Sequence, residues 1–319
     1  MLPGGVDEGS ECIDYNDSIY DNIEVPIMEK RSDILVGMPV YKGHREWILN
    51  DGLVGRFAHQ YDFCDQMYID NTLDDDSFYE ELKLAQSQWS SPSVVEVRKH
   101  CWKPEDDWML YMLGDCYNEC IEYAIENGYK WFIWTAADTF IDDNNMPSKK
   151  VIDKLISYDL DFVSIPTNVY TVDGPPSVYK TPYWNWSEEK KRFEPDICSW
   201  EELQELGGGG LIKVWGSIGC VLLKVDALEK KGLRFVHPPD KHIAMGEDFF
   251  FIQKCEQEHV NVIVDTSMRA FNNTKGVDAL NGGYKKAYYD KWVKKPLEPS
   301  KCRIIDIDGK KVKGDEVYA

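Results

Sequence analysis

The sequence predicts an α/β protein built on a mainly parallel sheet with helices on both faces. Short apolar runs alternate with helical patterns along the first half of the chain, and this alternation is typical of strand-helix-strand units. The runs are apolar at successive positions, as in residues 33–40 (DILVGMPV), which indicates strands buried on both faces. The chain has 319 residues and is 43% hydrophobic, so it is long enough to bury a core of this kind.

The strands of the first half are predicted from apolar runs that end in polar or turn residues. These predicted strands are residues 33–40, 66–71, 93–97 and 131–135. Apolar residues at helical spacing predict the intervening helices at residues 45–60, 74–88 and 106–127. Gly128 provides the stop signal of the third helix.

The second half begins with a predicted helix at residues 149–158 and a strand at 162–166, and then changes character. Residues 170–206 are rich in proline and aromatic side chains, and the four glycines at 207–210 predict a flexible hinge or lid. The remaining predicted elements are a strand at 213–223 interrupted by two glycines, a helix at 248–259, a strand at 260–265 and a hairpin at 301–313 with an Asp-Gly turn.

The composition argues against several classes of partner. A formal net charge of −20 is unfavourable for nucleic acid or an anionic membrane surface, because phosphate binding depends on Lys and Arg. The charge would suit a divalent cation, although a solvated acidic surface is the simpler explanation. The nine cysteines are scattered without zinc-site spacing, which favours reduced thiols. Because no signal-peptide pattern and no transmembrane segment is recognisable, we expect a cytoplasmic protein.

Three polar positions fall at or just beyond the ends of predicted strands. Tyr41, Asp70 and Asp138 follow or close the first, second and central strands, and open α/β sheets bind ligands outside these carboxyl ends. Tyr41 can stack on a base, and Asp70 can accept hydrogen bonds from a base or ribose. Asp138 can hold a hard divalent cation that bridges two phosphates. The alternative is that each is an ordinary polar residue at a strand end.

The ordered motifs of the chain resemble those of the GT-A glycosyltransferases, in particular the family-2-like group of the nucleotide-diphospho-sugar transferase superfamily. The resemblance covers residues 33–272. It rests on residues 36–41 (VGMPVY), 68–71 (YIDN), Asn118 with Ala124, 136–138 (AAD), 216–219 (GSIG) and 246–248 (GED). It implies a Rossmann-like, mixed but mainly parallel sheet flanked by helices, with a decorated acceptor-side half toward the C-terminus.

The activity that the resemblance implies is that of a hexosyltransferase. Such an enzyme moves a sugar from a UDP- or GDP-linked donor to a hydroxyl group of a glycan or another acceptor, with metal assistance. The matching positions imply nucleotide contacts for Pro39, Val40, Tyr41, Asp70 and Asn118.

The resemblance also implies the groups that perform the chemistry. Asp138 matches the last aspartate of the DxD motif and would bind Mn²⁺ or Mg²⁺. Asp248 matches the acid that takes the proton from the acceptor hydroxyl, and Glu247 would orient the acceptor. A carboxylate at a helix start can act as a general base if it reaches the hydroxyl. The alternative for both acids is N-capping of the helix.

The acceptor is expected to contact aromatic and glycine residues of the second half. Trp184 and Trp186 can stack on an acceptor sugar, although clustered aromatic residues also serve as packing. Gly216 and Gly219 lie on the predicted acceptor-side strand, where glycines indicate close approach of another backbone or a ligand.

Two departures from the pattern bear on the metal. The motif reads Ala136-Ala137-Asp138, without its first aspartate, and residues 265–273 lack the histidine that many relatives carry after the last core strand. A non-catalytic module that recognises a glycan or nucleotide is therefore the main alternative. A sugar-nucleotide nucleotidyltransferase is a weaker one, because the segment after the first strand carries a single glycine, Gly43, in place of a glycine-rich phosphate loop.

The predicted domain organisation is a single catalytic domain with two extensions. Residues 1–32 form an N-terminal extension and 33–295 form the GT-A-like domain, with a nucleotide-binding half at 33–145 and an acceptor half at 146–295. Residues 296–319 form a C-terminal tail or hairpin.

Overall fold

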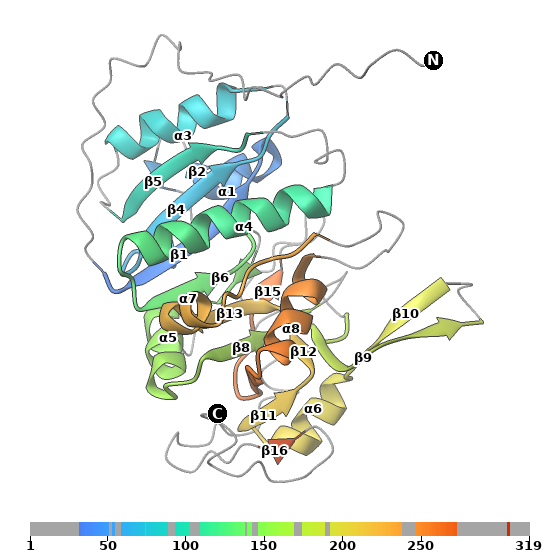
Figure 1. Cartoon of the computed structure of the whole chain (residues 1–319). Coiled ribbons are helices and arrows are strands. Elements are labelled where there is room, and N and C mark those ends of the chain that lie inside the picture. Colours follow the sequence, from blue (N-terminus) through green and yellow to red (C-terminus); the bar gives the residue numbers. More distant parts are fainter. Residues whose placement is uncertain are drawn as a thin grey trace, which may run out of the picture.

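A nine-stranded sheet is the centre of the part of the chain that the structure describes (Figure 1). The structure is a computed structural model. It describes residues 32–50, 53–54, 59–73, 75–88, 93–101, 109–137, 139–141, 146–168, 174–188, 192–237, 247–272 and 305–306. The strand order in the sheet is β16-β11-β14-β8-β13-β6-β1-β4-β5.

The four strands predicted in the first half form one parallel block of this sheet. They are β1 (Ile34–Val40), β4 (Asp65–Asp70), β5 (Val94–Lys99) and β6 (Trp131–Trp134). β1 pairs with β4 on one side and β6 on the other, with Val40 opposite Asp70 and Gly37 opposite Trp134. Two of the predicted intervening helices are confirmed, as α3 (Ser77–Gln88) and α4 (Met109–Glu126).

The other half of the sheet is mixed. β13 (Gly219–Lys224) runs antiparallel between β6 and β8 (Phe162–Pro166), and β8 is parallel to β14 (Val262–Asp265). β11 (Leu211–Val214) is antiparallel to β14 and parallel to β16 (Ile305–Asp306). The predicted fold class, a mixed and mainly parallel sheet flanked by helices, is confirmed.

Smaller elements decorate this sheet. The helical ones are η1 (Lys42–His44), α1 (Arg45–Ile48), α5 (Ser148–Ser157), α6 (Trp200–Gly207), α7 (Val225–Lys230) and α8 (Glu247–Gln257). The short strand pairs are β2 (Leu49–Asn50) with β3 (Leu53–Val54), and β7 (Thr139–Phe140) with β15 (Phe271–Asn272). A separate three-stranded sheet contains β10 (Arg192–Ile197), β9 (Val178–Ser187) and β12 (Gly216–Ser217).

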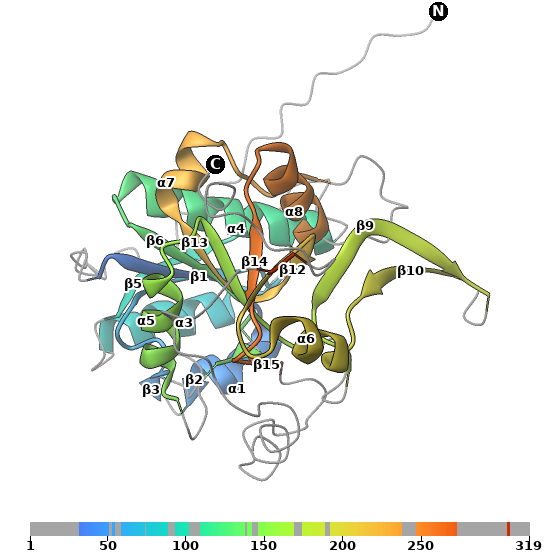
Figure 2. The same ribbon diagram turned by 90° about the horizontal axis from the view of Figure 1, so that it is seen from below.

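Two hydrophobic cores cover the two faces of the main sheet, and Figure 2 shows the helices that lie on each face. One face packs against α4, α7 and α8, and the other against α3 and α5. Alternate residues of β1 serve the two cores, with Leu35 in the first and Val36 in the second. Gly37 lets α4 approach closely, because a Cβ atom there would lie 2.5 Å from Cβ of Cys120.

The helix predicted at residues 45–60 is wrong. The helical segment ends at Ile48 and is followed by the antiparallel strands β2 and β3. The sequence between those strands is Asp51-Gly52, a pair that favours a tight hairpin turn. The apolar residues of this stretch suit a helix by spacing, and the Asp-Gly signal was the better guide.

The strand predicted at residues 213–223, with interruptions at two glycines, is divided among β11, β12 and β13, which lie in two different sheets. Gly219 begins β13 with a φ of 138°, and a Cβ atom there would lie 2.9 Å from the carbonyl oxygen of Ile165. The glycine therefore marks a sharp change of direction between sheets.

The glycine run at 207–210 ends a helix. Gly207 is the last residue of α6, and Gly208 caps it in the left-handed conformation, with its N–H bonded to the carbonyl of Gln204. The N-terminus of α6 has a capping box between Ser199 and Glu202. The segment is thus a helix end, and its role as a flexible hinge or lid stays a prediction. Of the predicted C-terminal hairpin only β16 lies in the described residues, and nearly all of the N-terminal extension lies outside them.

Candidate active site

The carboxyl ends of β1, β4 and β6 lie along one edge of the sheet, as their register requires. β1 is flanked by β4 on one side and β6 on the other, so the strand order reverses between β1 and β6. Open α/β sheets bind ligands at such a switch point. We call this margin the switch-point edge. It comprises Val40 and Tyr41 at the end of β1, Asp70 at the end of β4, and Trp134 and Thr135 at the end of β6.

Tyr41 presents a half-exposed ring at the switch-point edge. It leaves β1 in an extended conformation and precedes η1, and 48% of its surface is exposed. Its ring meets that of His44 edge-on at a centroid distance of 4.1 Å. Burial lowers the pKa of His44 to about 4, so this imidazole is neutral at pH 7. Pro39 and Val40 are buried, and the carbonyl of Val40 accepts a hydrogen bond from the N–H of Asn71.

Asp70 is buried and its carboxylate is already engaged. One oxygen accepts from the N–H and the hydroxyl of Thr72, at 3.0 and 2.6 Å. The other lies 3.0 Å from Nζ of Lys99, at the end of the neighbouring strand β5. These contacts link the ends of two strands. A nucleotide contact for Asp70 stays a prediction, and a ligand would have to share this carboxylate with Lys99 and Thr72.

Asn118 uses its amide group within the protein. Its Nδ2 donates to the carbonyl of Phe235 at 2.9 Å, and its Oδ1 accepts from the N–H of Phe235 at 2.8 Å. The two bonds fix the segment after α7 against α4. The role of Asn118 in nucleotide binding also stays a prediction.

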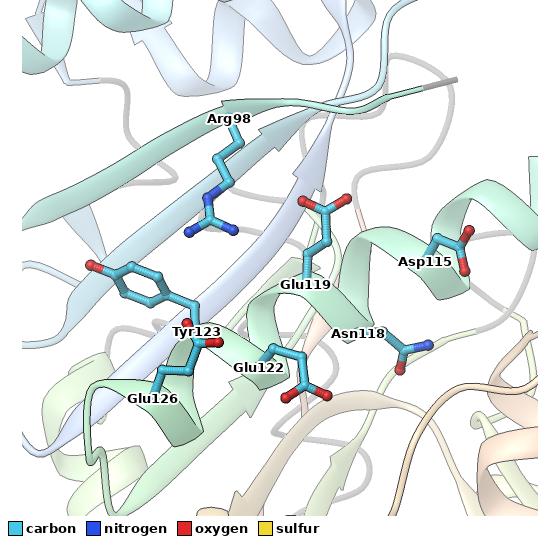
Figure 3. Close-up of a pocket in the computed structure, with 7 residues that line it drawn as sticks. All are labelled: Arg98, Asp115, Asn118, Glu119, Glu122, Tyr123 and Glu126. Carbon is cyan, nitrogen blue, oxygen red and sulfur yellow. The ribbon is translucent and has the colours of Figure 1, made fainter. Parts of the chain in front are cut away.

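A cleft of about 270 Å³ lies beside Asn118 on the outer side of α4 (Figure 3). In the close-up, Arg98 points from β5 toward the helix, and Glu119 points toward it. The lining residues are Arg98, Asp115, Asn118, Glu119, Glu122, Tyr123 and Glu126. Two of the carboxylates contact side chains outside the cleft, Asp115 that of His237 at 2.9 Å and Glu122 that of Arg234 at 2.7 Å. A diphosphate would meet an excess of negative charge here, so this cleft does not suit the predicted donor.

Glu247 and Asp248 form a close pair of acids at the first turn of α8. Glu247 lies against α4. A Cβ atom placed at Gly114 of that helix would be 3.6 Å from the Cβ atom of Glu247. Burial, with the charge of Asp248 as the second cause, raises the pKa of Glu247 to about 8. Burial also raises the pKa of Asp248, against the opposing effect of the hydrogen bond that its carboxylate accepts from the N–H of Phe249.

An aromatic cluster connects this acid pair to the switch-point edge. Phe235 stacks on Tyr117 and on Phe251, with centroid distances of 5.0 and 4.4 Å. Trp134, the last residue of β6, meets Phe235 and Phe251 edge-on at 4.9 and 5.4 Å. Phe251 lies one helical turn beyond Glu247. This apolar cluster adjoins the first turn of α8 and belongs to the buried surroundings that disfavour the charged forms of the two acids.

Sequence reasoning missed Tyr117, Trp134, Phe235 and Phe251 as parts of the site. They come from four elements or connections far apart in the chain, and no local spacing links them. The acids themselves were found because they are adjacent and begin a predicted helix. The alternative of N-capping is not supported by the bond from the N–H of Phe249, because both acids lie within α8 and an N-cap side chain accepts an N–H two or three residues on.

The predicted acceptor residues divide into two places. Gly216 lies in β12, where a Cβ atom would be 2.9 Å from Cδ1 of Ile252 in α8, so this glycine permits close packing beside the acid-bearing helix. Trp184 and Trp186 lie in β9, opposite Pro195 and Phe193 of β10. The β9–β10 hairpin projects from the body of the protein in both views (Figures 1 and 2). The structure describes the strand that carries the two tryptophans but not their side chains.

The predicted metal ligand Asp138 lies outside the described residues as well. The residues on either side of it are described, and β7 after it pairs with β15. Among the described residues, no group of three or more His, Cys, Asp or Glu side chains is arranged to hold a metal ion.

Comparison with known proteins gives similarity to solved structures only. No protein-family model and no curated protein matches the chain. Residues 1–349 of S. aureus TarS match with 12% identity and a TM-score of 0.41, over 76% of this chain and 58% of that one. A longer TarS structure matches with 13% identity and a TM-score of 0.43, over 84% and 41% of the two chains. GalNAc-T7, crystallised with UDP, GalNAc and Mn²⁺, matches with 12% identity and a TM-score of 0.47, over 75% and 43%.

The chain thus spans between about two fifths and three fifths of the length of these proteins. Its sheet order and mixed strand directions are consistent with the GT-A fold that the sequence resembles. In the described part of the chain, no helix is long and apolar enough to cross a membrane.

Proposed function

We propose that the protein is a glycosyltransferase that moves a sugar from a UDP- or GDP-linked donor to a hydroxyl group of a glycan or another acceptor. The observation that carries the proposal is the partly buried acid pair Glu247 and Asp248, which adjoins an aromatic cluster reaching the switch-point edge. Tyr41 presents a half-exposed ring on the same edge. The ordered motifs of the sequence support the same reading.

The chemistry assigns different roles to the two acids. The acceptor oxygen attacks the anomeric carbon while the bond from that carbon to the phosphate oxygen breaks, and the nucleoside diphosphate leaves. The hydroxyl proton passes to Asp248, whose raised pKa makes it a stronger base than an exposed aspartate. Glu247 keeps its proton to a higher pH than an ordinary glutamate and can donate a hydrogen bond to the acceptor.

The donor side of the proposal rests on Tyr41. A half-exposed ring at a switch point suits stacking on a nucleobase, since every base has a flat face. Pro39 and Val40 would then hold Tyr41 in place through the buried end of β1. Asp138 is the residue that would bind Mn²⁺ or Mg²⁺ together with the phosphates, and the cation would neutralise charge on the leaving diphosphate.

A thermal-shift titration tests the proposal. UDP and GDP are each added with and without Mn²⁺ to the wild type and to Asp138→Ala. A nucleotide that binds the native state raises the Tm by linkage. We expect stabilisation by one nucleotide that depends on Mn²⁺ and is lost in Asp138→Ala. Failure of both nucleotides to raise the Tm of the wild type would refute the proposed donor site.

One set of observations favours a second candidate, a binding module without activity. Two predicted nucleotide ligands, Asp70 and Asn118, are engaged within the protein, and Ala136 replaces the first aspartate of the motif. Turnover of UDP- and GDP-sugars distinguishes the two candidates. A transferase releases the free nucleotide in the presence of acceptor, whereas a binding module is stabilised by the ligand and releases nothing. Pyrophosphate release from a nucleoside triphosphate would instead indicate a nucleotidyltransferase.

A further inference from the structure

The ring of Tyr41 lies against Gly43, two residues further along the chain. A Cβ atom placed at Gly43 would be 2.7 Å from Cζ and 2.8 Å from the hydroxyl oxygen of Tyr41, and it would approach Cε2 more closely still. Real Cβ atoms essentially never come within 3.0 Å of another heavy atom in this way. The ring therefore occupies space that a side chain at position 43 would fill.

The ring of Tyr41 has two neighbours in the η1 turn, and part of its surface stays accessible. Gly43 and the edge-on ring of His44 bound it on the side of the η1 turn. The N–H of His44 donates to the carbonyl of Tyr41 at 2.7 Å, which closes that turn. Nearly half of the surface of Tyr41 remains exposed. The aromatic surface at the switch-point edge is thus folded back over its own turn.

We propose that Gly43 is a positioning residue, and that its missing side chain sets the ring of Tyr41 in the orientation that receives a nucleobase. The inference rests on the proposed function, because the orientation matters to a ligand only if Tyr41 contacts one. A ring that is already oriented loses little conformational freedom when a base stacks on it. A methyl group at position 43 would turn the ring away.

The substitution Gly43→Ala isolates this effect. Gly43 lies within the η1 turn and does not have a positive φ, so alanine can adopt its backbone conformation. The atoms that a new Cβ would meet belong to the far end of the Tyr41 side chain, which can rotate. We therefore expect the Tm of Gly43→Ala to be no lower than that of the wild type.

A double-mutant cycle on the full chain tests the inference, with UDP and GDP as the probes in calorimetric titrations. For the nucleotide that binds the wild type, we expect Tyr41→Ala and Gly43→Ala each to raise the Kd about tenfold, the scale of one stacked base. The double variant should bind no more weakly than either single variant, because both remove the same contact. Tyr41→Phe serves as the matched control that keeps the ring.

Three results would overturn the inference. In the first, Gly43→Ala keeps the wild-type Kd while Tyr41→Ala weakens binding, which leaves the proposed function intact. In the second, the losses in the double variant add, so that Gly43 acts through another contact. In the third, neither nucleotide binds the wild type, and the proposed function fails together with the inference.

A ligand-free readout separates these failures. The hydrogen of Gly43 that a Cβ atom would replace lies against the ring, so its NMR resonance should be displaced by the ring current and should return to an ordinary position in Tyr41→Ala. An ordinary resonance in the wild type would refute the positioning role whatever the nucleotide titrations show.

Discussion

Asn118 holds Phe235 by both of its main-chain polar atoms, with bonds of 2.9 and 2.8 Å. The amide donates one bond and accepts the other, so no side chain that only donates or only accepts can replace it. Phe235 is the member of the aromatic cluster that stacks on both Tyr117 and Phe251. This clamp therefore joins α4 to the apolar surroundings of the acid pair.

Replacement of Asn118 by alanine should weaken the fold more than it weakens nucleotide binding. The change leaves the N–H and carbonyl of Phe235 without their partner, which costs about 1–3 kcal/mol. Urea denaturation should show this loss of unfolding free energy. Asn118→Asp keeps the acceptor but not the donor, so its unfolding free energy should fall between those of the wild type and Asn118→Ala. An undiminished stability together with a loss of nucleotide affinity would mean that Asn118 is a ligand contact and that the clamp is incidental.

Lys99 should contribute to the stability of the fold only while Asp70 carries its charge. In Lys99→Met the buried carboxylate loses its cation, and breaking a buried pair in this way typically costs about 3–5 kcal/mol. We expect the lower end of that range, because the side chain of Lys99 is 22% exposed and the pair is therefore not fully buried. The free energy of unfolding from urea titrations measures the loss.

The double variant Asp70→Asn with Lys99→Met is the matched control. It removes both charges and keeps an oxygen for Thr72, so most of the lost stability should return. A double variant as unstable as Lys99→Met alone would show that the lysine stabilises the edge through its other contacts, with Asp76 and the carbonyl of Asp75.

A side chain at Gly37 should destabilise the junction of β1 and α4. The new methyl group would lie 2.5 Å from Cβ of Cys120 and 2.6 Å from Cε2 of Phe132, and overpacking of this kind costs about 1–3 kcal/mol. Gly114→Ala is the matched control on the same helix. Its Cβ atom would meet its nearest neighbour at 3.4 Å, and alanine favours a helix interior by up to about 1 kcal/mol. In thermal unfolding, the Tm should therefore fall in Gly37→Ala and rise in Gly114→Ala.

The strands β1, β4, β5 and β6 could be predicted because burial on both faces leaves a continuous apolar run in the sequence. The helix α4 could be predicted from its periodicity and from Gly128, which has a positive φ of 63° after the helix end. The short hairpin of β2 and β3 was lost because its apolar residues also fit helical spacing. The Asp51-Gly52 pair between these strands was the local signal that favoured the hairpin.

The candidate site was predictable only where its residues are adjacent in sequence. Glu247 and Asp248 could be found from the start of a helix, whereas Gly114, against which Glu247 packs, lies more than a hundred residues earlier in the chain. The engagement of Asp70 by Lys99 depends in the same way on the pairing of β4 with β5. Such contacts are set by topology, and no spacing in the sequence encodes them.

The stability of the fold should depend on the protonation of Glu247. The pKa of this side chain is raised from 4.5 to about 8 in the native state, so between these values the native state holds a proton that the unfolded chain releases. Stability from this group is therefore present at low pH and is lost as the pH rises through this window. In Glu247→Gln that loss should disappear, which makes the variant more stable than the wild type at pH 8 by at most roughly 4 kcal/mol.

Urea titrations at pH 5 and pH 8 measure this difference. The exposed residue Glu201 provides a control, since Glu201→Gln should leave the pH dependence of stability as it is in the wild type. If Glu247→Gln loses stability equally at both pH values, Glu247 is charged in the native protein and its hydrogen-bonding role in the proposed mechanism is wrong.

Asp248→Asn should remove transfer while leaving the donor bound. The amide is nearly the same size as the carboxylate and can still accept the N–H of Phe249, but it cannot take a proton from the acceptor. A positioned base contributes about 10²–10⁴-fold to the rate, so we expect the turnover of the nucleotide-sugar to fall by at least about 100-fold with an unchanged Kd for UDP or GDP.

In the wild type, activity should rise with pH through the raised pKa of Asp248, because only the deprotonated form accepts a proton. Glu247→Gln should lower turnover less, since glutamine can still donate a hydrogen bond. Wild-type turnover in Asp248→Asn would exclude this aspartate as the base, and a parallel loss of nucleotide affinity would mean that it contacts the donor instead.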